Sequence, residues 1–305
     1  MRKSKVALLG TEYHSAKIEQ ELKAMGIEAT YERINVSILS YIKLLIRYDY
    51  YFITYGRSSY KFIFMFLLPL FLLRRKVYIE WIGSDVIDLR KFYSKCRARL
   101  ISKLATNLCE CDWIQRELRE LSVDSKVGPY ITFSSLFNTE KEKETLPGKL
   151  IVTTYAPKGN ERLYNLDLII DTFKGQSDME LNVVAHDGEN FDKSDSVKFH
   201  GWLDKSDLNN LYDNTDVFVR MTSHDGLSYS VLEAMSRKMQ VIFTYDYPNT
   251  NRVSTKDDLA EILKKYVNKK KNGEDIINHK GSDFIKDNFV NSKLSENNLK
   301  SLFSN

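Results

Sequence analysis

The 305-residue chain is poor in cysteine and has no hydrophobic run long enough to cross a bilayer. Its three cysteines are an odd number without the spacing of a disulfide framework, which excludes a disulfide-stapled secreted domain and favours a reducing compartment. The longest apolar run, residues 62–73, has twelve residues, whereas a spanning helix needs about 20. Residues 6–9 are too short an apolar run for a secretory signal. We therefore expect a cytoplasmic protein.

Patterns typical of metal sites and nucleic-acid-binding modules are also lacking. Cys109 and Cys111 would share one face if residues 107–111 formed a strand, but two further ligands are not found nearby. The net charge of +4 is modest, and the lysines at 264–271 follow a helical pattern at 259–263, so a solvated helix end explains them better than a nucleic-acid patch. We expect neither a metal nor a nucleic-acid partner.

The composition is that of a globular chain with more than one core, since 43% of the residues are hydrophobic and 28% are charged. In the first half, short apolar segments at 6–9, 51–54 and 77–81 read as strands, and residues 16–25, closed by Gly26, read as a helix. Such alternation predicts an α/β domain with a doubly wound parallel sheet.

A polar stretch at 138–145, followed by Pro147 and Gly148, interrupts this pattern and predicts an interdomain linker. The pattern then restarts. Strands are expected at 150–152, 181–184, 217–219 and 241–243, and a helix at 166–173. We therefore expect a first domain at 1–140, a second at 149–280 and a C-terminal helix within 281–305.

The most informative motif is HDGLSYSVLEAM at residues 224–235, directly after the expected strand 217–219. The carboxyl ends of parallel strands are where α/β folds bind ligands, so Asp225 is expected in a ligand site. The next helix begins near Ser228 or Ser230, and its N-terminus would attract a pyrophosphate that Gly226 lets approach closely. Glu233, inside that helix, can accept hydrogen bonds from the two hydroxyls of a ribose.

At these residues the chain resembles the large GT4-like group of retaining glycosyltransferases (glycosyl transferases group 1), whose members carry two acidic residues at this spacing ahead of Ala-Met. Lys158-Gly159 before the helix 166–173, and Gly83 to Val86, extend the resemblance over nearly the whole chain. It implies a GT-B fold, in which two Rossmann-like doubly wound domains face across a cleft and a closing helix packs back towards the first domain.

The resemblance also implies the reaction. It is the retaining, metal-independent transfer of a sugar from a nucleotide sugar, of UDP or GDP type, to a glycan or lipid-linked acceptor, as in cell-surface polysaccharide or glycoconjugate synthesis. No separate cofactor is implied, and the absence of an Asp-x-Asp motif is compatible with a metal-free site. Asp225 would contact the donor sugar and Glu233 the ribose.

Cationic groups must stabilise the departing diphosphate. The candidates for this catalytic role are Lys158 and Arg162, with Arg220 as a third. The further donor-binding candidates are Gly226, Leu227, Ser228, His224, Gly83, Ser84 and Asp85.

The chain departs from the family pattern at several places. Asp225 replaces the commoner Glu, and Lys158 and Arg162 do not reproduce the spacing of the Arg and Lys with which relatives often grip the diphosphate. Ile82 stands where many relatives have His, and Lys238 and Gln240 stand where relatives have Gly and Pro. These departures leave open a catalytically silent GT-B subunit, and an epimerase acting on a nucleotide sugar is a second alternative. A hydrolase is disfavoured, because the elbow-like residues 226–230 end in Ser rather than Gly and the required histidine would be His279.

The apolar run 62–73 is followed by Arg74, Arg75 and Lys76 and has two interpretations. It is either a helix buried against the first sheet and kinked or ended by Pro69, or a surface that makes peripheral contact with anionic lipid through residues 62–76 at the inner face of the cell membrane.

Overall fold

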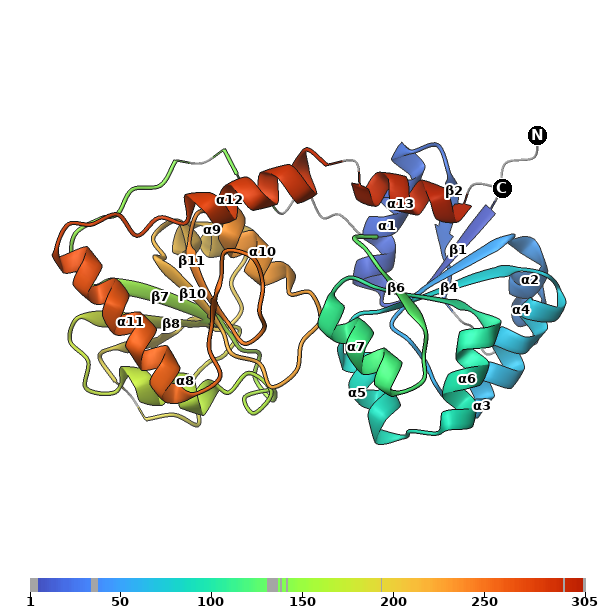
Figure 1. Cartoon of the computed structure of the whole chain (residues 1–305), viewed down its shortest axis with the longest axis horizontal. Helices are drawn as coiled ribbons and strands as arrows, with labels where there is room; N and C mark the ends of the chain where they lie inside the picture. The colour runs from blue at the N-terminus through green and yellow to red at the C-terminus, as the bar shows by residue number, and fades with distance from the viewer. Residues whose placement is uncertain are drawn as a thin grey trace. The chain divides into compact units, whose positions relative to one another are not determined.

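The computed structural model describes residues 5–33, 38–130, 137, 139–140, 142–192, 194–292 and 294–303. The chain forms two compact α/β units (Figure 1). Unit 1 comprises residues 1–133, 225–227 and 293–305, and unit 2 comprises residues 134–224 and 228–292. Each unit contains a six-stranded parallel sheet with interleaved helices, so the predicted α/β class with two doubly wound domains is confirmed.

Unit 1 has the strand order β2-β1-β3-β4-β5-β6, and all of its strand pairs are parallel. Its strands are β1 (Lys5–Gly10), β2 (Glu28–Tyr31), β3 (Tyr50–Thr54), β4 (Lys76–Trp81), β5 (Thr106–Cys109) and β6 (Ser125–Val127). Its helices are α1 (Glu12–Ala24), α2 (Ile38–Arg47), α3 (Tyr60–Phe62), a π-helical segment (Ile63–Leu67), α4 (Leu68–Leu72), α5 (Ser84–Lys91), α6 (Lys95–Leu104), α7 (Asp112–Glu120) and α13 (Leu294–Phe303).

The central strands of unit 1 are buried on both faces. Every residue of β3 is buried, as expected for a parallel sheet covered by helices on both sides. On one face, Phe303 of α13 packs its ring on Tyr50 and Tyr78, and the Tyr78 hydroxyl donates to Leu302 O at 2.5 Å. On the other, the Tyr51 ring meets Phe66 edge to face. The C-terminal helix that belongs to unit 1 is therefore α13, which begins at residue 294.

The apolar run 62–73 continues as a helix past Pro69, so the expectation that this proline ends the helix is wrong. Leu68 donates its N–H to Ile63 O, five residues back. This wide turn precedes a proline that has no N–H of its own to donate, and such turns are a recognised way to accommodate proline inside a helix. The run is only partly core. Its buried residues are Phe62, Ile63, Phe66, Leu67 and Leu70, and its exposed ones are Phe64, Met65, Phe71, Leu72 and Leu73.

Unit 2 has the strand order β12-β11-β10-β7-β8-β9, again with parallel pairs only. Its strands are β7 (Leu150–Tyr155), β8 (Met179–Val184), β9 (Val197–Phe199), β10 (Val217–Arg220), β11 (Gln240–Phe243) and β12 (Asn251–Arg252). Its helices are α8 (Leu166–Phe173), α9 (Lys205–Asp213), α10 (Tyr229–Ser236), α11 (Lys256–Lys271), α12 (His279–Ile285) and a π-helical segment (Lys286–Val290).

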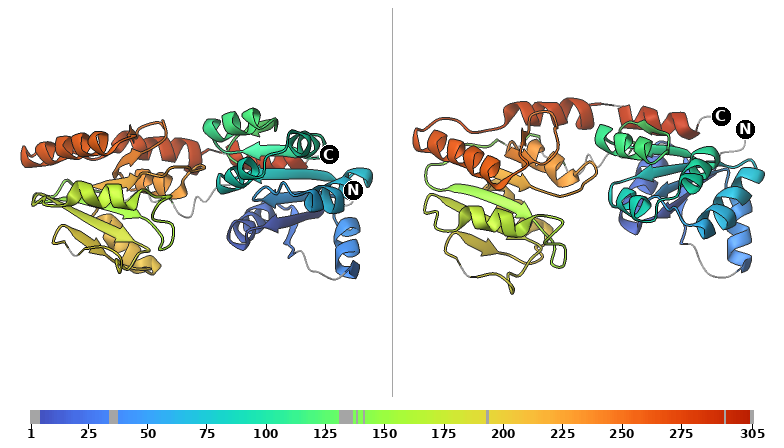
Figure 2. Two further views of the ribbon diagram at one scale, coloured as in Figure 1. Left: turned by 90° about the horizontal axis from the view of Figure 1, so that it is seen from below. Right: turned by 60° about the horizontal axis from the view of Figure 1, so that its bottom comes forward.

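Helices cover both faces of the unit 2 sheet, as the turned views in Figure 2 help to follow. On one face α8 and α11 form a core with inward residues of β7, β8 and β10, including Ile169, Leu263 and Val219. On the other, Tyr212 of α9 packs against Phe218, and α10 adjoins α12. The polar linker predicted at 138–148 lies partly outside the described residues.

The two cysteines singled out in the sequence do not lie on one strand. Cys109 ends β5, whereas Cys111 immediately precedes α7, so the conditional strand 107–111 is wrong at its C-terminal end. Both thiols are buried, and burial raises the pKa of Cys109 to about 11. This environment is typical of inert structural cysteines.

Candidate functional site

The strand order of unit 2 reverses between β7 and β10, which is where open α/β sheets bind ligands. The loop 156–165 leaves the carboxyl end of β7 and the segment 221–228 leaves that of β10. Hydrogen bonds join the two segments. Ser223 N–H donates to Leu163 O at 2.8 Å, and Asn165 Nδ2 donates to Met221 O at 3.1 Å. The fold therefore places the Lys158 loop beside the stretch leading to Asp225.

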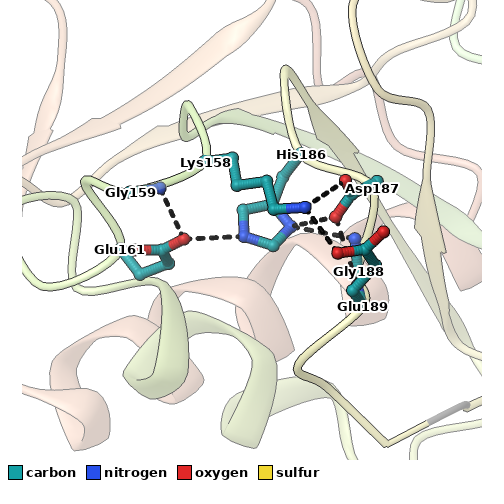
Figure 3. Close-up of polar contacts among 7 residues, drawn as sticks. All are labelled: Lys158, Gly159, Glu161, His186, Asp187, Gly188 and Glu189. Atoms are coloured by element: carbon teal, nitrogen blue, oxygen red, sulfur yellow. Dashed lines mark hydrogen bonds and ion pairs between the residues drawn. The ribbon is translucent and has the colours of Figure 1, made fainter.

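Lys158, one of the predicted diphosphate-binding cations, is held by two carboxylates from the loop after β8 (Figure 3). Its Nζ lies 2.7 Å from Asp187 Oδ2 and 2.6 Å from Glu189 Oε2. The hydrogen bonds to Asp187 and Glu189 raise the pKa of Lys158, and that to Lys158 lowers the pKa of Asp187. The Lys158 ammonium is therefore positively charged and exposed to solvent, and two carboxylates of the protein already balance its charge.

The buried His186 connects the same two loops (Figure 3). Gly188 N–H donates to its Nδ1 at 2.9 Å, so the ring proton lies on Nε2, which is 2.9 Å from Glu161 Oε1. Glu161 also accepts from Gly159 N–H at 2.7 Å, and this bond is the main reason that its pKa is lowered. The buried imidazole thus fixes the loop that carries Lys158 against the loop that carries Asp187.

The other two predicted cations differ in their surroundings. Arg220 ends β10, is only 8% exposed, and stacks its guanidinium over the Tyr164 ring at 4.6 Å. Arg162 is exposed in the turn before α8, and within the described part of the chain its side chain forms no ion pair. Arg220 is therefore a fixed charge at the switch point, whereas Arg162 can reorient.

Glu233, the predicted ribose acceptor, lies in the second turn of α10 and is half-buried. Its Oε1 is 3.6 Å from Arg237 Nη2, one helical turn further on, and Arg237 also reaches Asp213 Oδ1 at 3.4 Å. The Arg237 guanidinium packs over the Tyr212 ring, with 5.5 Å between its Cζ and the ring centroid. This pairing holds the Glu233 carboxylate beside a guanidinium.

Helix α10 ends at a residue other than glycine in a conformation that favours glycine. Lys238 adopts φ +61°, the left-handed conformation that glycine adopts without strain. Its N–H bonds to Met235 O and Met239 N–H bonds to Ala234 O, which together form a Schellman motif. The buried lysine extends to Glu142, with 3.2 Å between Nζ and Oε2.

The remaining members of the motif fall on either side of the unit boundary. His224 and Ser228 belong to unit 2, where Ser228 is the residue before α10 and its Oγ lies 3.0 Å from Ser230 Oγ. Residues 225–227, including Leu227, belong to unit 1, where Trp113 Nε1 donates to Asp225 O at 2.9 Å. Asp225 is half-buried.

The Gly83 turn of unit 1 follows β4 and is organised by Asp85. This buried carboxylate accepts hydrogen bonds from the backbone N–H groups of Gly56 at 2.6 Å, Gly83 at 2.9 Å and Ile82 at 3.1 Å. Burial nevertheless raises the pKa of Asp85 to about 6. A Cβ on Gly226 would lie 2.1 Å from Ile82 O, so only glycine fits there. In this arrangement Asp85 shapes the turn that presents Gly83 and Ser84.

Sequence reasoning missed several polar side chains of the unit 2 edge. They are Glu161, Tyr164, His186, Asp187, Glu189 and Arg237. Asp187-Gly188 after a strand was visible as a turn, and the i,i+4 spacing of Glu233 and Arg237 was a usable signal for an ion pair. The pairing of Lys158 with residues about thirty positions away had no local signal.

Comparison with known families agrees with this geometry. The model of the family described as glycosyl transferases group 1 matches residues 138–300, more than half of the chain. The chain belongs to this family. The matched region holds β7 to α12, and with them Lys158, Glu233 and the motif at 224–235.

Solved glycosyltransferase structures share the fold of this family member. HepE from Anabaena, determined in complex with UDP, is similar with a TM-score of 0.70 at 13% identity, over 98% of this chain and 99% of that one. Sucrose-phosphate synthase from Thermosynechococcus elongatus has a TM-score of 0.67 at 12% identity, over 94% and 95%. WaaG, a glycosyltransferase involved in lipopolysaccharide biosynthesis, has a TM-score of 0.62 at 10% identity, over 98% and 100%. These likenesses establish the GT-B fold.

No curated protein matches the chain. Among the described residues, no helix has the length and apolarity that a membrane span requires.

Proposed function

We propose that this protein is a retaining, metal-independent glycosyltransferase of the GT4-like group. It transfers a sugar from a UDP- or GDP-sugar to a glycan or lipid-linked acceptor in the synthesis of a cell-surface polysaccharide or glycoconjugate. Unit 2 binds the donor and no separate cofactor takes part. The enzyme works in the cytoplasm, and peripheral membrane contact through residues 62–76 belongs to the same proposal.

The observation that carries the proposal is the convergence of the switch-point loops in unit 2. Arg220 ends β10, and Lys158 and Arg162 lie in the loop after β7. All three cations are therefore at the same sheet edge as the segment leading to Asp225. Such an edge suits a nucleotide diphosphate because cations and unpaired helix N–H groups both stabilise its negative charge. The presence of UDP in the HepE complex supports UDP as the first nucleotide to test.

Each residue has a role in the proposed reaction. Glu233 accepts hydrogen bonds from the ribose hydroxyls, while Gly226, Leu227 and Ser228 let backbone N–H groups approach the diphosphate. As the bond between the anomeric carbon and the diphosphate oxygen breaks, Lys158, Arg162 and Arg220 stabilise the charge gained by the leaving group. The negative charge of Asp225 favours the oxocarbenium-like sugar at the same moment. His224 in unit 2, and Gly83, Ser84 and Asp85 in unit 1, remain further donor-binding candidates of the proposal.

A ligand-binding experiment tests the donor site directly. Purified protein is titrated with UDP, GDP, ADP, dTDP and CMP while its thermal unfolding is followed. One nucleotide is expected to stabilise the fold selectively, by roughly 2.7 kcal/mol when its concentration is 100 times its Kd. Glu233→Ala should abolish this stabilisation, and Glu261→Ala, an exposed glutamate on α11, should leave it intact.

Other outcomes point to the alternatives. If none of the five nucleotides stabilises the protein, the donor site is wrong and the silent GT-B subunit becomes the better description. If one nucleotide binds and its sugar derivative is converted to a stereoisomer without release of the diphosphate, the protein is an epimerase.

A further inference from the structure

Helix α2 presents apolar side chains on a solvent-facing side as well as on its packed side. Leu44 and Leu45 are buried, whereas Leu39, Ile42 and Ile46 are exposed, Leu39 to 71% and Ile46 to 57%. The spacing 39, 42, 46 places these three on one stripe of the helix. A typical surface helix has polar residues on its solvent-facing side, whereas this stripe of α2 exposes apolar side chains to solvent.

The helical run from Tyr60 to Leu73 adds exposed apolar residues beside this stripe. Figure 1 draws α2 and α4 next to one another in unit 1, and Arg75, just after α4, donates to Ile46 O at 3.1 Å. Tyr51 links them underneath, since its hydroxyl donates to Leu44 O at 2.6 Å and its ring contacts Phe66. The exposed residues of the run are Tyr60, Phe64, Met65, Phe71, Leu72 and Leu73. We call residues 38–47 and 60–76 together the apolar–basic surface.

The charge of this part of the chain is predominantly positive. Residues 38–76 contain seven lysines and arginines and one aspartate, a net charge of +6, whereas the whole chain has a net charge of +4. The remainder therefore carries −2. The one aspartate, Asp49, is paired with Arg75 at 3.0 Å. Exposed apolar patches of this kind mark interaction sites, and here the partner must also accept a concentrated positive charge.

We propose that the apolar–basic surface binds the surface of an anionic lipid bilayer, with α2 as one of its two docking elements. The stripe of α2 and the exposed side chains of 60–73 enter the boundary between headgroups and acyl chains, and Lys43, Lys61 and Arg74 lie at the headgroups. A second copy of the chain fits less well, because two such surfaces facing each other would oppose like charges. The surface lies in unit 1. The inference rests on the proposed function in one respect, because a lipid-linked acceptor would require the enzyme to approach a bilayer.

Vesicle flotation of the full-length protein tests the proposal. The probes are vesicles of equal parts phosphatidylglycerol and phosphatidylcholine, and vesicles of phosphatidylcholine alone, each at low and high salt. The wild-type protein is expected to float with the anionic vesicles at low salt, to bind them less at high salt, and to remain unbound with phosphatidylcholine. Salt reduces the attraction because the Debye length falls from ~10 Å at 0.1 M to ~3 Å at 1 M.

Two sets of variants locate the binding surface. The triple variant Leu39→Ser, Ile42→Ser, Ile46→Ser should weaken binding by at least about tenfold, and Lys43→Gln with Lys61→Gln should reduce the salt dependence. Leu146→Ser changes a leucine of unit 2 that is 55% exposed, and it should bind as the wild type does. Circular dichroism and thermal unfolding verify that each variant is folded.

Several outcomes would overturn the proposal. It fails if the wild type binds neither vesicle, or if the folded triple variant binds as tightly as the wild type. It also fails if sedimentation shows a dimer that the triple variant dissociates while no vesicle is bound, since the surface would then belong to a second copy. Nucleotide-induced stabilisation of the same samples reports on unit 2 separately, so a failed donor site is distinguishable from a failed lipid site.

Discussion

At the scale of single residues, the unusual feature of unit 2 is that a proposed diphosphate-binding lysine is already neutralised. Asp187 and Glu189 each contact Lys158 Nζ within 2.7 Å. A diphosphate would compete with both carboxylates for the same cation. Because all three side chains are exposed, water and salt screen these ion pairs, and the competition is weak.

Replacing Glu189 should therefore strengthen nucleotide binding. In Glu189→Gln the Lys158 ammonium keeps its charge but loses one competing carboxylate, so the Kd of the bound nucleoside diphosphate should fall by up to about fivefold. Isothermal titration calorimetry measures the change. Glu261→Gln, which neutralises an exposed glutamate on α11, serves as the control. If the Glu189→Gln protein binds the nucleotide more weakly than the wild type and the Glu261→Gln control do, the Glu189 carboxylate helps to hold the donor.

Glu80 of β4 is a buried carboxyl group of unit 1, and its burial makes the stability of the fold depend on pH. It is fully buried, and among the described residues neither of its oxygens has a hydrogen-bond partner. Burial, followed by the nearby charge of Glu110, raises its pKa well above the ordinary value. The folded protein therefore retains a proton on Glu80 that the unfolded chain loses. The stability contributed by this group is present at acid pH and declines as the pH rises above the ordinary glutamate pKa.

The substitution Glu80→Gln should flatten this pH dependence. The amide has nearly the same shape and no charge to bury, so the variant should gain stability relative to the wild type as the pH rises from about 5 towards 8, by at most ~1.4 kcal/mol per pH unit. Urea unfolding at several pH values measures the difference. Parallel pH profiles for the two proteins would contradict the assignment of Glu80 as a protonated buried acid.

At the scale of elements, sequence patterns predicted regular segments well and side-chain pairings poorly. The helix expected at 166–173 is α8, with the same bounds, because its apolar spacing, 3.6 residues per turn, is a local property. The strand expected before Asp225, at 217–219, was predicted equally well, since β10 spans Val217–Arg220. The wide turn before Pro69, the exposed stripe of α2 and the partners of Lys158 depend on tertiary packing, so local patterns do not specify them. The site-residue roles stay predictions.

The C-terminus of α10 gives a prediction at this scale. Lys238 holds a left-handed conformation that costs roughly 1–2 kcal/mol for a residue with a Cβ. Lys238→Ala and Lys238→Gly both lose the side chain and its contact with Glu142, but only glycine removes the backbone strain. The glycine variant should therefore be more stable than the alanine variant by about 1 kcal/mol in chemical denaturation. Equal stabilities would mean that the Schellman motif is not strained at Lys238.

At the scale of the whole molecule, donor chemistry and acceptor access are assigned to different units. The group 1 match covers 138–300 and thus unit 2 almost entirely, and the proposed donor residues Lys158, Arg220 and Glu233 lie there. The apolar–basic surface lies in unit 1. Loss of lipid binding should consequently leave the affinity of the donor nucleotide unchanged.

The central claim is that the protein breaks the bond between a sugar and a nucleoside diphosphate, with Asp225 at the reacting sugar. The most direct test is mass-spectrometric detection of diphosphate release from UDP- and GDP-sugars, in the presence of EDTA, by the wild type and by Asp225→Ala. The account predicts slow release by the wild type, and loss of release without loss of nucleotide binding in the variant. Absence of release from every donor, or equal release by the two proteins, would contradict it.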